Sequence, residues 1–324
     1  MVKTFKVLLY DEIRKFNPYH GPDGRFTGPG GAASFTYKPG QGRMYDLAIE
    51  REKKRTSGGS SGGGKSVGPD GGYKDGKCTA KTVEEAREYA KQKLGFDQVD
   101  YSYSYIDQKE GRQVTGTFDI DTINSVNATI TQIHERYPEM AGYLKVMETY
   151  DSNACAAVVH TSGDSKPPTL KLGAKHYSQG LEKMSEIKRR DAESGFHPKN
   201  CNTAESTIWH EYGHVYGAMQ NRKQTFENYG VPKDAPDFQK IGNHLFEQVV
   251  RQNAAEKLYQ SGSFKNSYGM ERPHLLAKKV SKYAQKNASE TFAEAFASYN
   301  MDPKVRNKFI QALMEESGVK KRYP

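Results

Sequence analysis

The stretch Trp209–His214 constrains this chain most, because it reads H-E-x-x-H. Two histidines four residues apart on a helix project from the same face, about one turn apart. The imidazoles of His210 and His214 would supply half of a tetrahedral zinc site. Glu211, between them, would lie beside the metal, where a carboxylate can accept a proton from water and pass it to a leaving amine. The motif therefore predicts a metal site on a helix.

The residues around the motif favour that helix. Asn202 and Glu205 are spaced as the N-cap residue and the N3 acid of a capping box. Ile208, Tyr212 and Val215 form an apolar stripe at helical spacing. The sequence thus predicts an amphipathic helix that begins near residue 202 and presents both histidines.

A catalytic zinc site needs a third protein ligand and one open position. The pattern H-E-x-x-H-x-x-G-x-x-H is only half present, because Gly217 is in place but Gln220 stands where a histidine is required. The other common solution is a glutamate from a later helix, and Glu290 and Glu294 share one face of a helix that Asn287 can cap. One carboxylate can bind zinc while the other hydrogen-bonds a ligand histidine. The alternative is a pair of solvated helix acids.

Three further residues are weaker candidates for the site. His160 and His197 could be ligands, although histidines in strands and turns are more often ordinary residues. Tyr283 lies upstream of the two acids. A tyrosine hydroxyl near a metal can stabilise an oxyanion or protonate a leaving group.

The N-terminal segment differs from the rest of the chain in charge and composition. Residues 1–78 contain 14 Lys and Arg against 8 Asp and Glu, and they hold 16 of the 31 glycines. We expect a basic docking or tail segment at 1–50, a flexible Gly/Ser-rich linker at 51–78 and a zinc metallopeptidase-like domain at 79–324. A basic tail can contact nucleic acid or an acidic partner, and a solvated linker is an equal alternative.

The cysteines and the apolar runs indicate where the protein is made. The chain has only three cysteines, Cys78, Cys155 and Cys201, and a small odd number does not form a disulfide framework. Free thiols suit a reducing compartment. The start of the chain lacks a signal-peptide apolar region, and no stretch is long enough to span a membrane. We therefore expect cytoplasmic synthesis without a signal peptide.

Periodicity predicts mainly helices after the linker. The expected strands are 99–106, 154–160 and 169–177, and the expected helices are 82–94, 120–137, 181–193, 238–259, 275–283, 289–299 and 305–316.

The segment 283–296, with its core E-x-F-A-E-A-F, resembles the second zinc segment of the anthrax lethal factor family of gluzincin peptidases. The H-E-x-x-H stretch resembles the first. In that family a tyrosine stands seven residues before the ligand glutamate, and Tyr283 and Glu290 keep this spacing. The resemblance implies zinc (Zn2+) on His210, His214 and Glu290, a general base at Glu211, an assisting acid at Tyr283 and support from Glu294.

This resemblance covers roughly 120–299 and also implies a fold. The expected class is α+β: a zincin-like domain with a small mixed sheet, the motif helix and a later glutamate helix, preceded by the flexible basic Gly-rich segment. The strand at 169–177 would be the sheet edge that binds substrate by strand addition. The stretch between the two zinc segments is longer than the family pattern, so an extra loop or helix is expected over the cleft.

A second resemblance lies near the N-terminus. Residues 16–20 and 24–27 are similar to a short element of phage head-morphogenesis (Mu protein F-like) proteins. It implies a phage or prophage protein that docks on head or other virion proteins through this segment. The leading expectation is a zinc endopeptidase acting on a protein or peptide, as a virion-associated protease or a toxin. The alternatives are a virion structural or cargo protein with an inactive metallopeptidase fold, and a nucleic-acid-associated head protein, for which no binding motif is recognisable.

Overall fold

The computed structural model describes residues 76–159, 167–227, 238–262, 276–302, 304 and 306–319. The chain divides into two units, 1–66 and 67–324, and every described residue belongs to the second. The docking segment expected at 1–50, most of the linker expected at 51–78, and His160 lie outside the described residues. The end of that linker lies against the domain: Gln132 Nε2 donates to the Gly76 carbonyl at 3.2 Å, and Cys78 is buried.

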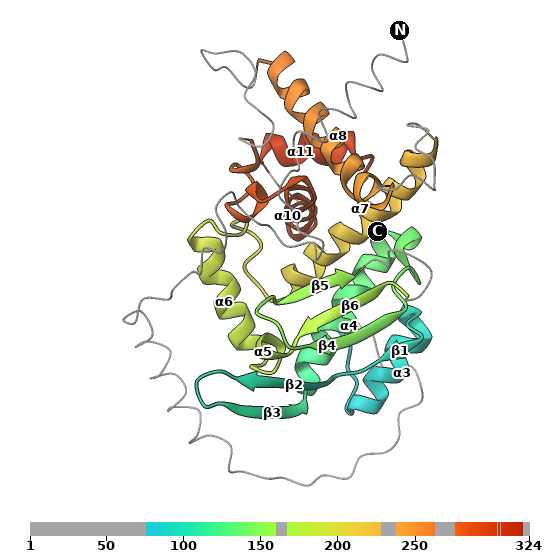
Figure 1. Ribbon diagram of the computed structural model, residues 1–324, viewed down its shortest axis with the longest axis vertical. Helices are drawn as coiled ribbons and strands as arrows, with labels where there is room; N and C mark the ends of the chain where they lie inside the picture. Colours follow the sequence, from blue (N-terminus) through green and yellow to red (C-terminus); the bar gives the residue numbers. More distant parts are fainter. Residues whose placement is uncertain are drawn as a thin grey trace. The chain divides into compact units, whose positions relative to one another are not determined.

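A four-stranded mixed sheet forms the centre of this unit (Figure 1). Its strands are, in spatial order, β1 (Gln98–Val99), β4 (Val146–Tyr150), β6 (Thr169–Gly173) and β5 (Ala156–Val159). The first three are parallel, and β5 runs antiparallel to β6. A separate antiparallel pair consists of β2 (Ser102–Asp107) and β3 (Arg112–Thr117). The expected small mixed sheet is confirmed.

The edge strand differs from the expectation. The strand over 169–177 ends at Gly173, where a short helix follows, and it lies inside the sheet between β4 and β5. Leu170 and Leu172 are fully buried, as expected for a strand with neighbours on both sides. Strand β5 is therefore the edge on this side of the sheet, and β1 is the opposite edge. An alanine Cβ at Gly173 would collide with the Ala154 carbonyl, so the glycine allows the start of β5 to approach closely.

Eight α-helices are described, together with the 3-10 helices η1 (Pro138–Met140) and η2 (Tyr283–Gln285). The α-helices are α3 (Val83–Leu94), α4 (Ile120–Arg136), α5 (Ala174–Tyr177), α6 (Leu181–Glu193), α7 (Glu205–Glu227), α8 (Phe238–Gln260), α10 (Ala288–Met301) and α11 (Lys308–Glu316). The helices expected at 82–94, 120–137, 181–193, 238–259 and 289–299 are confirmed to within about two residues. The helix expected at 275–283 is interrupted, because turns at 278–280 precede η2.

The capping box expected before the motif helix is absent. Helix α7 begins at Glu205, so Asn202 lies upstream of the N-cap position. The carboxylate of Glu205 instead accepts a hydrogen bond from Ser125 of α4, at 3.0 Å. Contact with a distant helix thus helps to fix the N-terminus of α7.

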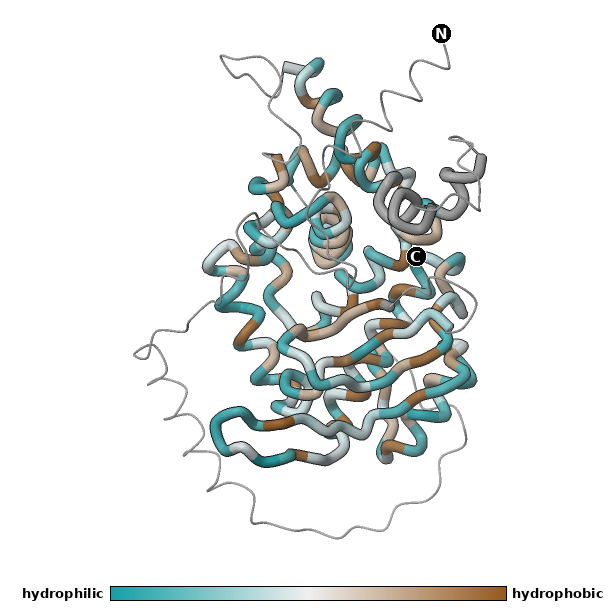
Figure 2. Tube along the Cα trace, viewed as in Figure 1, coloured by the Kyte–Doolittle hydropathy of each residue, from teal (hydrophilic) through white to brown (hydrophobic). Residues whose placement is uncertain are grey.

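Aromatic packing joins α7 to α10 in the core. Tyr216 of α7 stacks on Phe292 and Phe296 of α10, with ring centroids 6.0 and 5.9 Å apart. Figure 2 shows hydrophobic residues along the strands of the sheet, where Met147 and Leu170 are fully buried. This core fixes α7 between the sheet and α10, which is what positions the H-E-x-x-H residues.

Candidate metal centre

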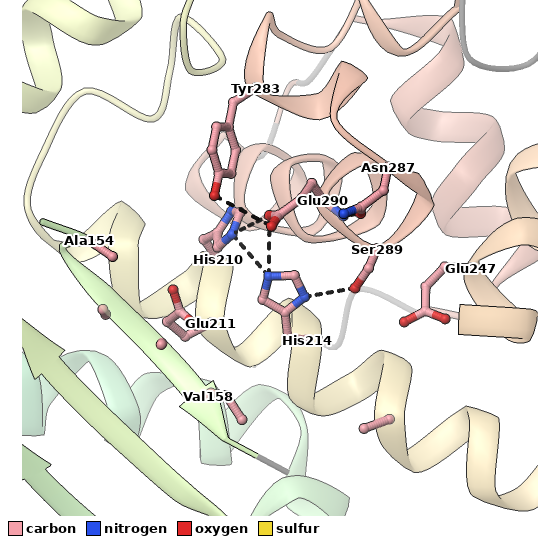
Figure 3. Close-up of a pocket in the computed structure, with 13 residues that line it drawn as sticks. Ala154, Val158, His210, Glu211, His214, Glu247, Tyr283, Asn287, Ser289 and Glu290 are labelled. Carbon is pink, nitrogen blue, oxygen red and sulfur yellow. Dashed lines mark hydrogen bonds and ion pairs between the residues drawn. The ribbon is translucent and has the colours of Figure 1, made fainter. Parts of the chain in front are cut away.

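Two helices bring three side chains to one point (Figure 3). His210 and His214 project from the same face of α7, and their Nε2 atoms lie 3.1 Å apart. Glu290, in the first turn of α10, places Oε2 at 3.1 Å from His210 Nε2 and 3.4 Å from His214 Nε2. All three side chains are largely buried. The sequence prediction of His210, His214 and Glu290 as one cluster is matched by this geometry.

A close approach of the two helices makes this meeting possible. An added Cβ at Gly213 would lie only 2.7 Å from Ala293 Cα of α10, so no larger residue fits between the helices as they stand. The start of α10 is fixed as predicted, because the Asn287 side chain accepts a hydrogen bond from the Glu290 amide at 2.8 Å. Glycine at one contact and a capped turn at another therefore place Glu290 opposite the histidines.

The three ligand atoms fit a metal ion. A tetrahedral ion with ligands at about 2.0–2.1 Å holds its ligand atoms about 3.3 Å apart. The observed separations of 3.1, 3.1 and 3.4 Å agree with that spacing. Glu290 Oε2 is also buried, and within the described part of the chain it accepts no hydrogen bond. A buried oxygen of this kind is costly unless something satisfies it. His210, His214 and Glu290 could thus hold a metal ion.

The other ring nitrogen of each histidine is hydrogen-bonded to a side chain of α10. His210 Nδ1 lies 2.9 Å from Glu294 Oε1, and His214 Nδ1 lies 3.0 Å from Ser289 Oγ. With hydrogen on Nδ1, each imidazole presents the lone pair of Nε2 to the metal position. The two acids of α10 are thereby separated in role: Glu290 faces the metal position and Glu294 holds His210 from behind.

The charges of the site favour a cation at its centre. Burial lowers the pKa of the His210 imidazole, but the carboxylates of Glu290 and Glu294 outweigh burial and raise that pKa to about 10. Burial alone would raise the pKa of Glu290, yet His210 and His214 hold it well below its usual range. Either a proton or a metal ion can supply the positive charge that this arrangement requires.

Glu211 and Tyr283 line the same cavity, which has a volume of about 350 Å³. Glu211 is 5% exposed and lies between α7 and β5, outside the ligand cluster (Figure 3). The Tyr283 hydroxyl donates to Glu290 Oε1 at 3.4 Å. Burial, reinforced by nearby carboxylates, raises the pKa of Tyr283 far above its usual value, so the hydroxyl keeps its proton at neutral pH.

His197 is not among the three clustered ligand side chains. Its Nδ1 lies 3.0 Å from Glu294 Oε1, so it contacts the carboxylate that holds His210 and does not face the metal position. Ser281 also donates to Glu294, at 2.8 Å. No short motif marks Ser281 or Ser289, although Ser289 directly precedes Glu290.

Glu247 of α8 is a cavity residue that sequence reasoning missed. It is 2% exposed, and its Oε2 accepts a hydrogen bond from Asn221 Nδ2 at 2.7 Å. Burial raises the pKa of Glu247 to about 7. A Cβ at Gly217 would overlap Glu247 Oε1, so this glycine, which matches half of the longer histidine pattern, makes room for a carboxylate.

Comparison of the chain with protein-family models, curated proteins and solved structures finds no match. The described helices include none that is both long enough and apolar enough to cross a membrane.

Proposed function

We propose that this chain is a zinc-dependent endopeptidase of the gluzincin type, with a zincin-like domain. The convergence of His210 Nε2, His214 Nε2 and Glu290 Oε2 carries the proposal. Two imidazoles and one carboxylate are the donor set of catalytic zinc sites, which keep a fourth position open for water or substrate. Magnesium and calcium prefer oxygen ligands, so the two nitrogens favour zinc over these two ions.

The cavity supports hydrolysis of a peptide bond. Zinc bound at the cluster would supply an activated water and polarise the substrate carbonyl. Glu211 lines the cavity beside the cluster, where its carboxylate would accept the proton of the attacking water and deliver it to the leaving amine. Tyr283, which keeps its proton, would donate a hydrogen bond to the oxyanion that develops on the carbonyl oxygen. Glu294 and Ser289 would keep the two imidazoles oriented.

The sheet edge supports an extended peptide substrate. Strand β5 pairs on one side with β6, is the last strand of the sheet, and contributes Ala156, Ala157 and Val158 to the cavity wall. An extended chain can add to such an edge through main-chain hydrogen bonds. The small side chains of β5 leave room for that backbone beside α7. We therefore place the substrate along β5, rather than along the strand at 169–173.

The biological setting is a separate part of the proposal. Assignment to a phage or prophage, as a virion-associated protease or a toxin, rests on the resemblance of residues 16–27, which are outside the described part of the chain. The competing proposal is a virion structural or cargo protein that keeps the fold without catalysis. Parallel measurement of zinc content and peptide cleavage separates the enzyme from the inactive structural protein.

The test measures zinc content and peptide cleavage in parallel. Wild type and the variants Glu211→Gln, Glu290→Ala and Glu256→Gln are incubated with a peptide mixture, with and without a chelator, and the products are identified by mass spectrometry. Glu256 is an exposed acid of α8, hydrogen-bonded to Gln260, and serves as the matched control.

We expect Glu211→Gln to keep zinc but lose cleavage, because an amide cannot accept the proton of water. Glu290→Ala should lose both, and Glu256→Gln should retain both. The proposed zinc peptidase is refuted if wild-type protein contains well under one zinc per chain even after zinc is added. Zinc-loaded wild type that cleaves nothing would favour the inactive structural protein.

A further inference from the structure

A line of buried polar side chains leads from the metal centre to α6. Lys188 Nζ lies 3.3 Å from His197 Nε2, and His197 Nδ1 lies 3.0 Å from Glu294 Oε1. Glu294 Oε1 in turn lies 2.9 Å from His210 Nδ1. We propose that Lys188 and His197 are positioning residues that fix the hydrogen-bond directions of Glu294 and His210, and thereby set the affinity of the site for its metal. The proposal rests on the proposed metal centre.

The directions of these hydrogen bonds follow from the chemistry of the donors. A lysine ammonium has three donors and no acceptor, so Lys188 must donate to His197 Nε2. His197 Nε2 then carries a lone pair, and the hydrogen of the neutral ring is on Nδ1. That hydrogen points at Glu294, whose Oε1 and Oε2 lie 3.0 and 3.2 Å from Nδ1. Lys188 therefore selects the tautomer of His197 that can donate to the carboxylate.

The carboxylate passes this constraint on to His210. Glu294 accepts from His197 and from the Ser281 hydroxyl, and an ionised carboxylate accepts only. His210 Nδ1 must therefore carry a hydrogen and donate to Glu294, which leaves the lone pair of His210 Nε2 for the metal. In the other tautomer of His197, a lone pair would face the carboxylate, and the two would repel each other.

Burial makes this arrangement energetically significant. Lys188 is 6% exposed and Glu294 is 2% exposed. Buried charges are costly unless they are paired and hydrogen-bonded. The imidazole of His197 lies between the ammonium and the carboxylate, so it connects two charges that do not touch. Loss of the ammonium would leave Glu294 with less positive charge nearby and His197 free to change tautomer.

The backbone holds His197 in place independently of Lys188. Lys282 N donates to the Gly195 carbonyl at 2.9 Å, and Tyr283 N donates to the Phe196 carbonyl at 3.0 Å. These two bonds join the turn before α7 to the segment that carries Tyr283. A change at Lys188 should therefore alter the hydrogen bonding of His197 without displacing its backbone.

The experiment measures zinc affinity and histidine tautomers in the full-length chain. Zinc affinity is obtained by competition with a chromophoric chelator, and tautomers are read from the ¹⁵N shifts of labelled histidines. The variants are Lys188→Met, Lys188→Arg, His197→Phe and His197→Asn. Lys183→Met is the control, because Lys183 lies on the same helix but pairs with Glu186 at 2.7 Å.

We expect Lys188→Met to shift His197 toward the tautomer with hydrogen on Nε2 and to weaken zinc binding about threefold to tenfold. His197→Phe should weaken it roughly tenfold or more, since removal of outer hydrogen-bond partners costs about 10–100-fold. Lys188→Arg keeps the donors and His197→Asn keeps a donor near the Nδ1 position, so both should lie closer to wild type. Lys183→Met should match wild type in both measurements.

Two results would overturn the proposal. The first is a Lys188→Met protein with unchanged zinc affinity and an unchanged His197 tautomer, even if its melting temperature falls, because the role of Lys188 would then be packing alone. The second is wild-type protein that takes up no zinc, which also refutes the proposed enzyme. If wild type binds zinc and the variants respond as expected, but wild type cleaves no peptide, only the proposed enzyme activity is refuted.

Discussion

Gly213→Ala should weaken the metal site by forcing its two helices apart. The new Cβ would lie 2.7 Å from Ala293 Cα, 3.2 Å from Phe296 Cβ and 3.3 Å from Ala293 Cβ. Ordinary contacts of a Cβ begin at 3.4 Å, so α7 and α10 must separate by about 0.7 Å at this point. The obstacle is backbone, so a change of side-chain rotamer cannot relieve it.

The size of this shift decides its effect on the metal. Metal–ligand distances tolerate deviations of only about 0.2 Å. A separation of about 0.7 Å would carry Glu290 away from the histidines, and we expect zinc affinity to fall at least as much as on loss of an outer partner, about 10–100-fold. Overpacking costs about 1–3 kcal/mol, while alanine gains about 1 kcal/mol over glycine in a helix. The zinc-free protein should therefore lose at most about 2 kcal/mol of unfolding free energy.

Chelator competition and denaturant unfolding of the zinc-free protein measure the two effects separately. Gly217→Ala is the matched control on the same helix, because its Cβ would meet only side-chain atoms of Glu247 on α8 and not the backbone of α10. The control should keep zinc affinity near wild type. A Gly213→Ala protein that binds zinc as tightly as wild type would refute the argument that this contact sets the ligand geometry.

Three further predictions test separate parts of the structure. Glu294→Ala should weaken zinc binding roughly 10–100-fold while Glu290→Ala abolishes it, and metal analysis showing the reverse order would exchange their roles. Tyr101→Phe should cost about 1–3 kcal/mol in denaturant unfolding without changing zinc affinity, because the Asn127 Oδ1 that Tyr101 contacts at 2.9 Å would be left buried without that donor. Glu247 has its pKa raised from 4.5 to about 7, so the folded state favours the protonated form and its stability falls as pH rises from about 4.5 to 7. Glu247→Gln should remove this dependence and add about 3 kcal/mol above pH 7, as measured by unfolding at pH 5 and pH 8; equal slopes in both proteins would contradict it.

The sequence by itself determined the local features of the site. The four-residue spacing of His210 and His214 places both imidazoles on one helix face wherever that helix packs. The same holds for α10, where Asn287 caps the helix and puts Glu290 in its first turn. Such features depend on residues a few positions apart, so they can be read from spacing. The expected helices at 82–94 and 181–193 were predictable for the same reason.

Tertiary structure decided the features that depend on distant segments. Glu290 and Glu294 share one helix face, and only contact with α7 shows that the first faces both Nε2 atoms while the second contacts His210 Nδ1. His197 was a candidate ligand by residue type, and packing placed it behind Glu294 instead.

Which strand lies at the edge of the sheet also depends on distant segments. Strand β6 is apolar enough to be central, yet its sequence does not specify its neighbours. In the structure β5 pairs with the side of β6 that faces away from β4 and forms the edge. Strand pairing depends on hydrogen bonds and packing between segments that a periodic pattern treats separately. Local spacing therefore predicted which side chains share a helix face, whereas the position of each supporting group was fixed only when α6, α7, α10 and the sheet packed together.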